Sequence, residues 1–166
     1  MHSNPVFNFT IDKENHTIHI TREFDANLEL VWKAWTTAEL LDQWCAPNPH
    51  RIETKTLHFR EGGYWHYALV SPDGNKHWSR YDYKKIEPQK AITELRIFSD
   101  ENGTVNPDFP PTECTTTFSR NDNKTLITII EKYQNPEVFE KMATDSHRKG
   151  FSSHLRNLDE LLQTLK

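Results

Sequence analysis

Residues Val31–Pro47 read VWKAWTTAELLDQWCAP and carry the clearest local pattern in the chain. The first half continues a helical spacing of apolar residues that begins at Leu28, directly after Asn27, a residue type that caps helix starts well. The second half begins at another capping residue, Thr37, and has to end by Pro47, because proline lacks an amide hydrogen and clashes with the preceding turn. The pattern therefore predicts two short helices in direct succession.

The sequence on both sides of these helices is typical of β-strands. Residues 16–24 have a period of two that predicts a half-buried strand, whose buried face carries Ile18, Ile20, Arg22 and Phe24. Six more strands are predicted after the helices, at residues 52–60, 64–71, 76–87, 91–99, 112–120 and 125–134. The separators are rich in turn residues, which favour hairpins over crossovers, so the sheet is expected to be an antiparallel meander.

One of these hairpins fixes which side chains share a face. Residues Ser71–Asn75, SPDGN, suit a three-residue loop whose glycine takes the left-handed conformation and whose two end residues pair. Counting back from that pair places Trp65 opposite Tyr81. One side of the sheet is then expected to carry Trp65, Tyr67, Leu69, Tyr81 and Tyr83.

The C-terminal part returns to a helical pattern after Pro136. A stripe of apolar residues flanked by polar ones predicts a long amphipathic helix, with the stripe formed by Phe151, Leu155, Leu158, Leu162 and Leu165. The aromatic side of the sheet is expected to meet this helix. Residues 100–111 contain one glycine and three prolines, which predicts an exposed loop.

Length and composition narrow the class of protein. The 166 residues suit a single domain, with a core at about residues 16–165 and an N-terminal extension at 1–15. A net charge of −4 leaves no basic excess for nucleic acid or an anionic membrane, so neither is expected as a partner. No apolar run is long enough to span a bilayer and the start lacks a secretion signal, so the protein is expected in the cytoplasm. Cys45 and Cys114 have no metal-site spacing and are expected to be free thiols.

Several motifs, taken together in their order and spacing, resemble one family. They are Val31–Pro47, Arg60-Glu61-Gly62-Gly63-Tyr64-Trp65, Pro72-Asp73-Gly74 and Gly150-Phe151 with the leucines that follow. They resemble the activator of heat-shock protein 90 ATPase homologue-like family of the START-like (SRPBCC, Bet v 1-like) superfamily, over about residues 16–165. The resemblance implies an α+β helix-grip fold: a curved antiparallel sheet of about six or seven strands around a long C-terminal helix. Two short helices after the first strand would close one end of an apolar cavity.

The resemblance leaves three functions open, because such families include ligand carriers, cyclases and a co-chaperone domain. The leading expectation is non-enzymatic binding of a small hydrophobic or aromatic molecule between the sheet and the C-terminal helix. The alternatives are a co-chaperone-like stimulator of a heat-shock ATPase, with a chaperone as partner, and a polyketide cyclase or aromatase-like enzyme. The expected cavity residues are Trp35, Trp44, Trp65, Tyr67, Leu69, Tyr81, Tyr83, Phe151 and Leu155.

Two considerations weigh against the prediction of a ligand-binding cavity. An aromatic stripe taken alone is more often plain core packing than a binding site. In addition, Tyr81 stands where the family usually has glycine, and the resemblance implies that this large ring shrinks or reshapes the cavity. A familiar ligand of the family is therefore not carried over to this chain.

No pattern for catalysis, a cofactor or a metal is present in the sequence. The pairs His16/His19 and His147/His154 lack the His-Glu-x-x-His arrangement, and surface or capping roles are expected for the histidines. The chain has neither a glycine-rich phosphate loop between a strand and a helix nor a Gly-x-Ser-x-Gly motif. If the cavity is catalytic, the phenols of Tyr67, Tyr81 and Tyr83 are the candidates to orient an enolate. The sequence leaves the oligomeric state open.

Overall fold

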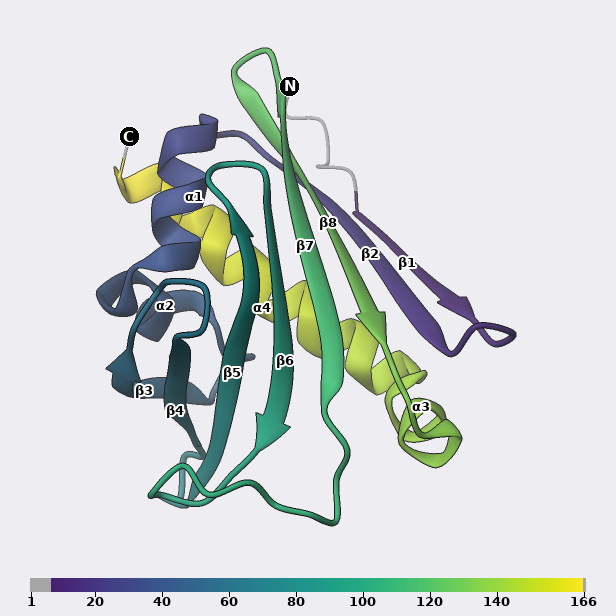
Figure 1. Cartoon of the computed structure of the whole chain (residues 1–166). Helices are drawn as coiled ribbons and strands as arrows, with labels where there is room; N and C mark the ends of the chain where they lie inside the picture. Colours follow the sequence, from purple (N-terminus) through teal and green to yellow (C-terminus); the bar gives the residue numbers. More distant parts are fainter. Residues whose placement is uncertain (1–6, 166) are drawn as a thin grey trace.

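A computed structural model describes residues 7–165, in which one curved antiparallel sheet wraps around a long helix (Figure 1). The order of the strands across the sheet is β1-β2-β8-β7-β6-β5-β4-β3. The strands are β1 Phe7–Asp12, β2 Thr17–Phe24, β3 Arg51–Leu57, β4 Tyr64–Val70, β5 Lys76–Glu87, β6 Ala91–Phe98, β7 Thr112–Asn121 and β8 Lys124–Lys132. The helix-grip fold is confirmed, including the antiparallel meander from β3 to β8.

The strand count is eight rather than six or seven, because β1 belongs to the sheet. Residues 7–12 were expected to be part of an extension, yet Phe7 pairs with Arg22 and Ile11 with Ile18 along the edge of β2. The signal was a short period-two pattern, in which Phe7, Phe9 and Ile11 pack against the core. The Asp12 side chain closes the turn to β2 by accepting a hydrogen bond from the Asn15 amide at 3.1 Å.

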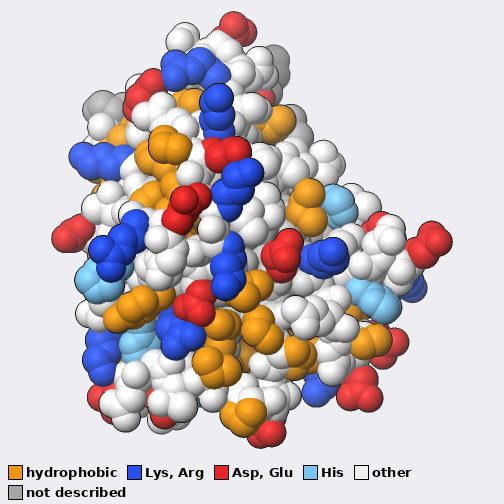
Figure 2. Space-filling model, viewed as in Figure 1, with side chains coloured by type: hydrophobic (Ala, Val, Ile, Leu, Met, Phe, Trp, Pro, Cys, Tyr) orange, Lys and Arg blue, Asp and Glu red, His pale blue; other side chains and the backbone are white. Residues whose placement is uncertain are grey.

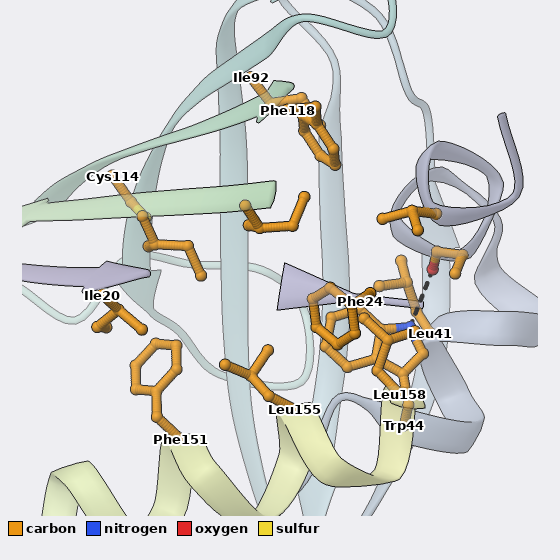
Figure 3. Close-up of a cluster of buried hydrophobic side chains, with 14 of the residues drawn as sticks. Ile20, Phe24, Leu41, Trp44, Ile92, Cys114, Phe118, Phe151, Leu155 and Leu158 are labelled. Carbon is orange, nitrogen blue, oxygen red and sulfur yellow. Dashed lines mark hydrogen bonds between the residues drawn. The ribbon is translucent and has the colours of Figure 1, made fainter. Parts of the chain in front are cut away.

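The paired helices form as the sequence predicts, as α1 Leu28–Thr36 and α2 Ala38–Trp44. The Asn27 side chain caps α1 by accepting a hydrogen bond from the Leu30 amide at 2.8 Å, whereas Thr37 precedes α2 without a side-chain cap. The Trp44 indole donates a hydrogen bond to the carbonyl of Ala34 at 3.0 Å, which ties the two helices together (Figure 3).

The C-terminal segment forms two helices, α3 Pro136–Met142 and α4 Asp145–Leu165. Asn135 caps α3 through bonds from the amides of Glu137 and Val138. The chain then leaves the helical conformation at Ala143 and starts again, because the Thr144 hydroxyl accepts a hydrogen bond from the His147 amide at 3.2 Å. The break turns α3 aside, so that only α4 crosses the inner face of the sheet (Figure 1).

The core lies between α4 and the inner face of the sheet. Leu155, Leu158 and Leu162 are fully buried, and Figure 3 shows Phe151, Leu155 and Leu158 projecting from α4 towards side chains of the strands. Each fully buried leucine of this kind contributes roughly 1.5–3 kcal/mol of transfer free energy. Burial of this stripe explains why the helix stays on the sheet.

The predicted hairpin register is confirmed. Trp65 pairs with Tyr81, Tyr67 with Ser79 and Leu69 with His77, and Gly74 has a φ of +89°. The same register puts His66 and Arg80 together on the outer face, where both bond to carbonyls of the loop after β6. This loop, residues 99–111, is exposed as expected.

The outer face of the sheet carries charges of both signs side by side, as Figure 2 shows over β5, β6 and β7. Hydrophobic side chains gather near the end of the sheet where β6 leads into its loop (Figure 2), and Val105 and Phe109 of this loop are exposed. No helix within residues 7–165 is both long and apolar enough to cross a membrane.

Two glycines provide a matched test of backbone conformation. An added Cβ would meet nothing within 4 Å at either Gly74 or Gly150, but Gly74 has a positive φ whereas Gly150 lies inside α4. We expect Gly150→Ala to raise the free energy of unfolding by about 0.8 kcal/mol, because glycine is a poor helix former. Gly74→Ala should lower it by about 1 kcal/mol, since alanine is strained at positive φ. Chemical denaturation measures both changes in the free energy of unfolding. Equal effects would contradict the left-handed conformation of Gly74 and the helical conformation of Gly150.

Candidate ligand-binding cleft

An open cleft lies between the inner face of the sheet and the helices α3 and α4. Its volume is about 700 Å³. The strands β3 to β6 supply one wall and the helices supply the other. The residues that line the cleft are Cys45, Pro47, Ile52, Tyr67, Leu69, His77, Ser79, Tyr81, Arg96, Phe98, Lys141, Met142, Thr144, Ser146, His147, Gly150, Phe151 and His154. The sheet and the terminal helix thus enclose open space at this end of the molecule.

A smaller recess adjoins the cleft. Its volume is about 160 Å³, and it shares seven lining residues with the cleft: Tyr67, Ser79, Tyr81, Arg96, Phe98, Met142 and His147. Ile97, Thr112, Glu131, Tyr133 and Val138 complete its walls. An apolar cavity of about 150 Å³ is known to accommodate benzene, so the recess has the size of one aromatic ring.

The structure divides eight of the nine predicted cavity residues into two groups of four. Tyr67, Leu69, Tyr81 and Phe151 line the cleft. Trp35, Trp44, Trp65 and Tyr83 surround a space of only about 40 Å³ at the closed end of the grip, together with Tyr81 and Phe151. Leu155 is fully buried in the core and lines none of these three spaces.

Two tryptophans of the second group, Trp44 and Trp65, are core residues, whereas Trp35 is partly buried against the core. Trp65 is 1% exposed and donates a hydrogen bond from its indole to the Thr54 hydroxyl at 3.0 Å. Trp44 is 2% exposed and has its own bond to Ala34. The indole N–H groups of Trp44 and Trp65 thus have hydrogen-bond partners inside the protein, as buried polar groups require. The two rings lie in the core behind the wall of the cleft.

The wall that the sheet contributes to the cleft is aromatic. The rings of Trp65 and Tyr67 stack at 4.1 Å, and Tyr81 meets Tyr67 edge-on at 5.6 Å. Burial raises the pKa of Tyr67 to about 12 and raises that of Tyr81 well above its usual value. Both phenols are therefore protonated at neutral pH and present hydroxyl groups as well as ring faces.

A polar cluster lies at the inner end of the cleft and consists of Glu94, Arg96, Glu131, Tyr133 and His147. Arg96 donates to Glu131 at 3.1 Å and, over 3.4 Å, to Glu94. The second oxygen of Glu131 accepts bonds from the Tyr133 hydroxyl at 3.1 Å and from Nε2 of His147 at 2.9 Å. The guanidinium also lies over the Tyr81 ring, 4.7 Å from its centre.

The two carboxyl groups of the polar cluster have opposite pKa shifts. Burial raises the pKa of Glu94 to about 7 despite the lowering effect of Arg96, and one of its oxygens has no hydrogen-bond partner among the described residues. Burial alone would raise the pKa of Glu131. The hydrogen bond from His147 and the charge of Arg96 outweigh this effect and lower the pKa. Glu131 is therefore the anionic centre of the polar cluster at neutral pH.

Sequence reasoning missed this polar cluster. Surface or capping roles were expected for the histidines, but His147 bonds to a buried carboxylate and His154 lies in the cleft wall, where burial lowers its pKa to about 3. A signal did exist on β6, where Glu94 and Arg96 continue the inward phase set by Ile92. Their phase places charged groups on a face that is otherwise buried.

The thiols offer little reactivity. Cys45 and Cys114 are both free, and burial raises the pKa of Cys45 to about 12 and raises that of Cys114 well above its usual value. A protonated thiol is a poor nucleophile, so neither is a strong catalytic candidate. Within the described part of the chain, no three His, Cys, Asp or Glu side chains form a group that could hold a metal ion.

Comparisons with known proteins agree with this architecture. A model of the family described as "Activator of Hsp90 ATPase homolog 1-like protein" matches residues 25–163. A solved structure from Arthrobacter aurescens is similar with a TM-score of 0.87 and 27% identity, covering 95% of this chain and 91% of that one. A Mycobacterium smegmatis protein has a TM-score of 0.85 and 24% identity, over 96% and 97% of the two chains. No protein of curated function matches.

Proposed function

The chain belongs to the Activator of Hsp90 ATPase homolog 1-like family, and on this premise we propose that it binds a small aromatic molecule in the cleft without transforming it. The fold supports a ligand-binding domain in general. The observation that carries the specific proposal is the cleft of about 700 Å³ that continues into a ring-sized recess. Its volume lies within the range of about 300–1,000 Å³ typical of small-molecule sites.

The chemistry of the walls supports an aromatic ligand. Tyr67 and Tyr81 offer ring faces and edges on one side, while Met142 and Phe151 offer apolar contacts from the helices. Offset and edge-on contacts between aromatic rings contribute about 0.5–1.5 kcal/mol beyond the burial of area. A flat ring can use such contacts on two sides, whereas a flexible aliphatic chain would use only its apolar area.

We expect Ser79→Phe to weaken binding strongly by filling the recess. Ser79 lines both the recess and the cleft, and it pairs with Tyr67 across the strands. Titration of the neutral fluorescent probe N-phenyl-1-naphthylamine should give a saturable signal with the wild type and an affinity lower by about tenfold or more with the variant. Ser119→Phe is the matched control, because Ser119 is exposed on β7. Absence of saturable binding of this probe and of a panel of small aromatics to the wild type would refute the proposed function.

Two alternatives are distinguished by the same variants. The family description favours stimulation of a heat-shock ATPase, which would use an outer surface; Ser79→Phe should then leave stimulation of the chaperone's ATPase unchanged. A cyclase-like activity is favoured by the position of the Arg96 guanidinium beside the Tyr81 phenol, where an enolate oxygen could be stabilised. Turnover of a poly-β-ketone substrate, lost in Ser79→Phe, would establish that alternative.

A further inference from the structure

A charged side chain, Arg96, lines the recess and is also accessible from the cleft. Arg96 lies on an inner strand beneath the helices, yet 22% of its side chain is exposed, against 4% for Glu94 and 3% for Glu131. Arg96 lines the cleft, the recess and the small space at the closed end. A molecule that enters the recess can therefore reach the guanidinium as well as apolar side chains.

Arg96 has donors to spare. A guanidinium carries five N–H groups, and the bonds to Glu94 and Glu131 use one on each of its three nitrogens. One N–H therefore remains on each terminal nitrogen. The Tyr81 ring beneath the guanidinium and the two carboxyl groups beside it fix its position, so that these donors are oriented before a ligand arrives.

Resting on the binding function proposed above, we infer that the ligand is a neutral aromatic compound bearing a carbonyl oxygen that accepts a hydrogen bond from Arg96. The ring occupies the recess between Tyr81 on the sheet and Val138 and Met142 on α3. The carbonyl group takes the place of water on the unused N–H groups. This assigns Arg96 as the residue that selects the ligand's polar end.

The charge balance of the polar cluster favours a neutral group over a carboxylate. Two carboxyl groups already face the one guanidinium, at 3.1 Å and 3.4 Å, so its positive charge is compensated. A ligand carboxylate would lose its hydration and be repelled by Glu131. A ligand ammonium would meet Arg96 itself, and the oxygens of Glu131 are already occupied by Arg96, Tyr133 and His147.

The test is the ranking of three probes of similar size on the wild-type protein: acetophenone, ethylbenzene and benzoate. Their dissociation constants are measured at pH 7.5 by ligand-observed NMR and by displacement of N-phenyl-1-naphthylamine. In an apolar recess ethylbenzene would bind more tightly than acetophenone, because the ketone loses hydration without compensation. We expect the reverse order, with acetophenone binding about tenfold more tightly than ethylbenzene and benzoate binding most weakly.

A variant then assigns the effect to the guanidinium. Arg96→Gln should remove most of the preference for acetophenone while ethylbenzene still binds, and Arg120→Gln, at an exposed pair with Glu29, should change neither. The wild-type ranking stands even if Arg96→Gln fails to fold. If ethylbenzene binds as tightly as acetophenone, or benzoate binds best, the inference about the polar end is wrong while the binding function survives. If none of the three probes nor the naphthylamine binds, the binding function itself fails.

Discussion

Arg96→Met is expected to lower the free energy of unfolding by about 3–5 kcal/mol at pH 8, because it leaves two buried carboxylates without their common partner. Glu94 and Glu131 are 4% and 3% exposed, and Arg96 is the only cation that the described residues place in a salt bridge with Glu94. The loss should shrink at pH 5, where protonation of Glu94 removes one of the two charges. Urea denaturation at both pH values measures the difference.

Arg120→Met provides the control for this substitution. Arg120 and Glu29 form a short ion pair, but both side chains are 54% exposed. Exposed pairs contribute only about 0–1 kcal/mol, since water already solvates both charges. Similar losses for the two variants would mean that the polar cluster is as hydrated as the surface, and the account of a compensated buried guanidinium would be wrong.

The second large effect is a pair of opposite pH dependences from Glu94 and His154. Burial raises the pKa of Glu94 from 4.5 to about 7, so its neutral form stabilises the fold below pH 4.5 and this contribution is lost as the pH rises through 7. Burial lowers the pKa of His154 from 6.5 to about 3, so its contribution is present above pH 6.5 and is lost as the pH falls towards 3. Between pH 4.5 and 6.5 the two contributions oppose each other.

Single substitutions should separate the two contributions. Relative to the wild type, Glu94→Gln should gain about 2 kcal/mol of stability between pH 5 and pH 7, because the wild type alone has to ionise a buried carboxyl group. Relative to the wild type, His154→Asn should gain about 2 kcal/mol between pH 7 and pH 5, since only the wild type resists protonation there. Denaturation curves at pH 5, 6 and 7 provide the measurement. Parallel curves for all three proteins would show that neither group is held in its neutral form by burial.

The sequence by itself determined the elements whose signals are local. The Asn27 cap, the apolar spacing and Pro47 set the paired helices, and the SPDGN turn set the register of Trp65 against Tyr81. The apolar stripe from Phe151 to Leu162 predicted the helix that the sheet surrounds. These three features follow from periodicity and turn chemistry within a few residues, and none of them depends on the rest of the chain. The edge strand β1 carried a signal of the same kind, but it was too short to be separated from an extension.

Only the tertiary structure decided which aromatic residues face open space and which polar groups meet there. Trp65 and Tyr67 lie two residues apart on the same face, yet one supports the wall from within the core and the other lines the cleft. Arg96, Glu131 and His147 come from β6, β8 and α4. The physical reason is that burial and Coulomb interactions depend on distance in space, and only the strand order and the path of α4 bring these three side chains within hydrogen-bond reach.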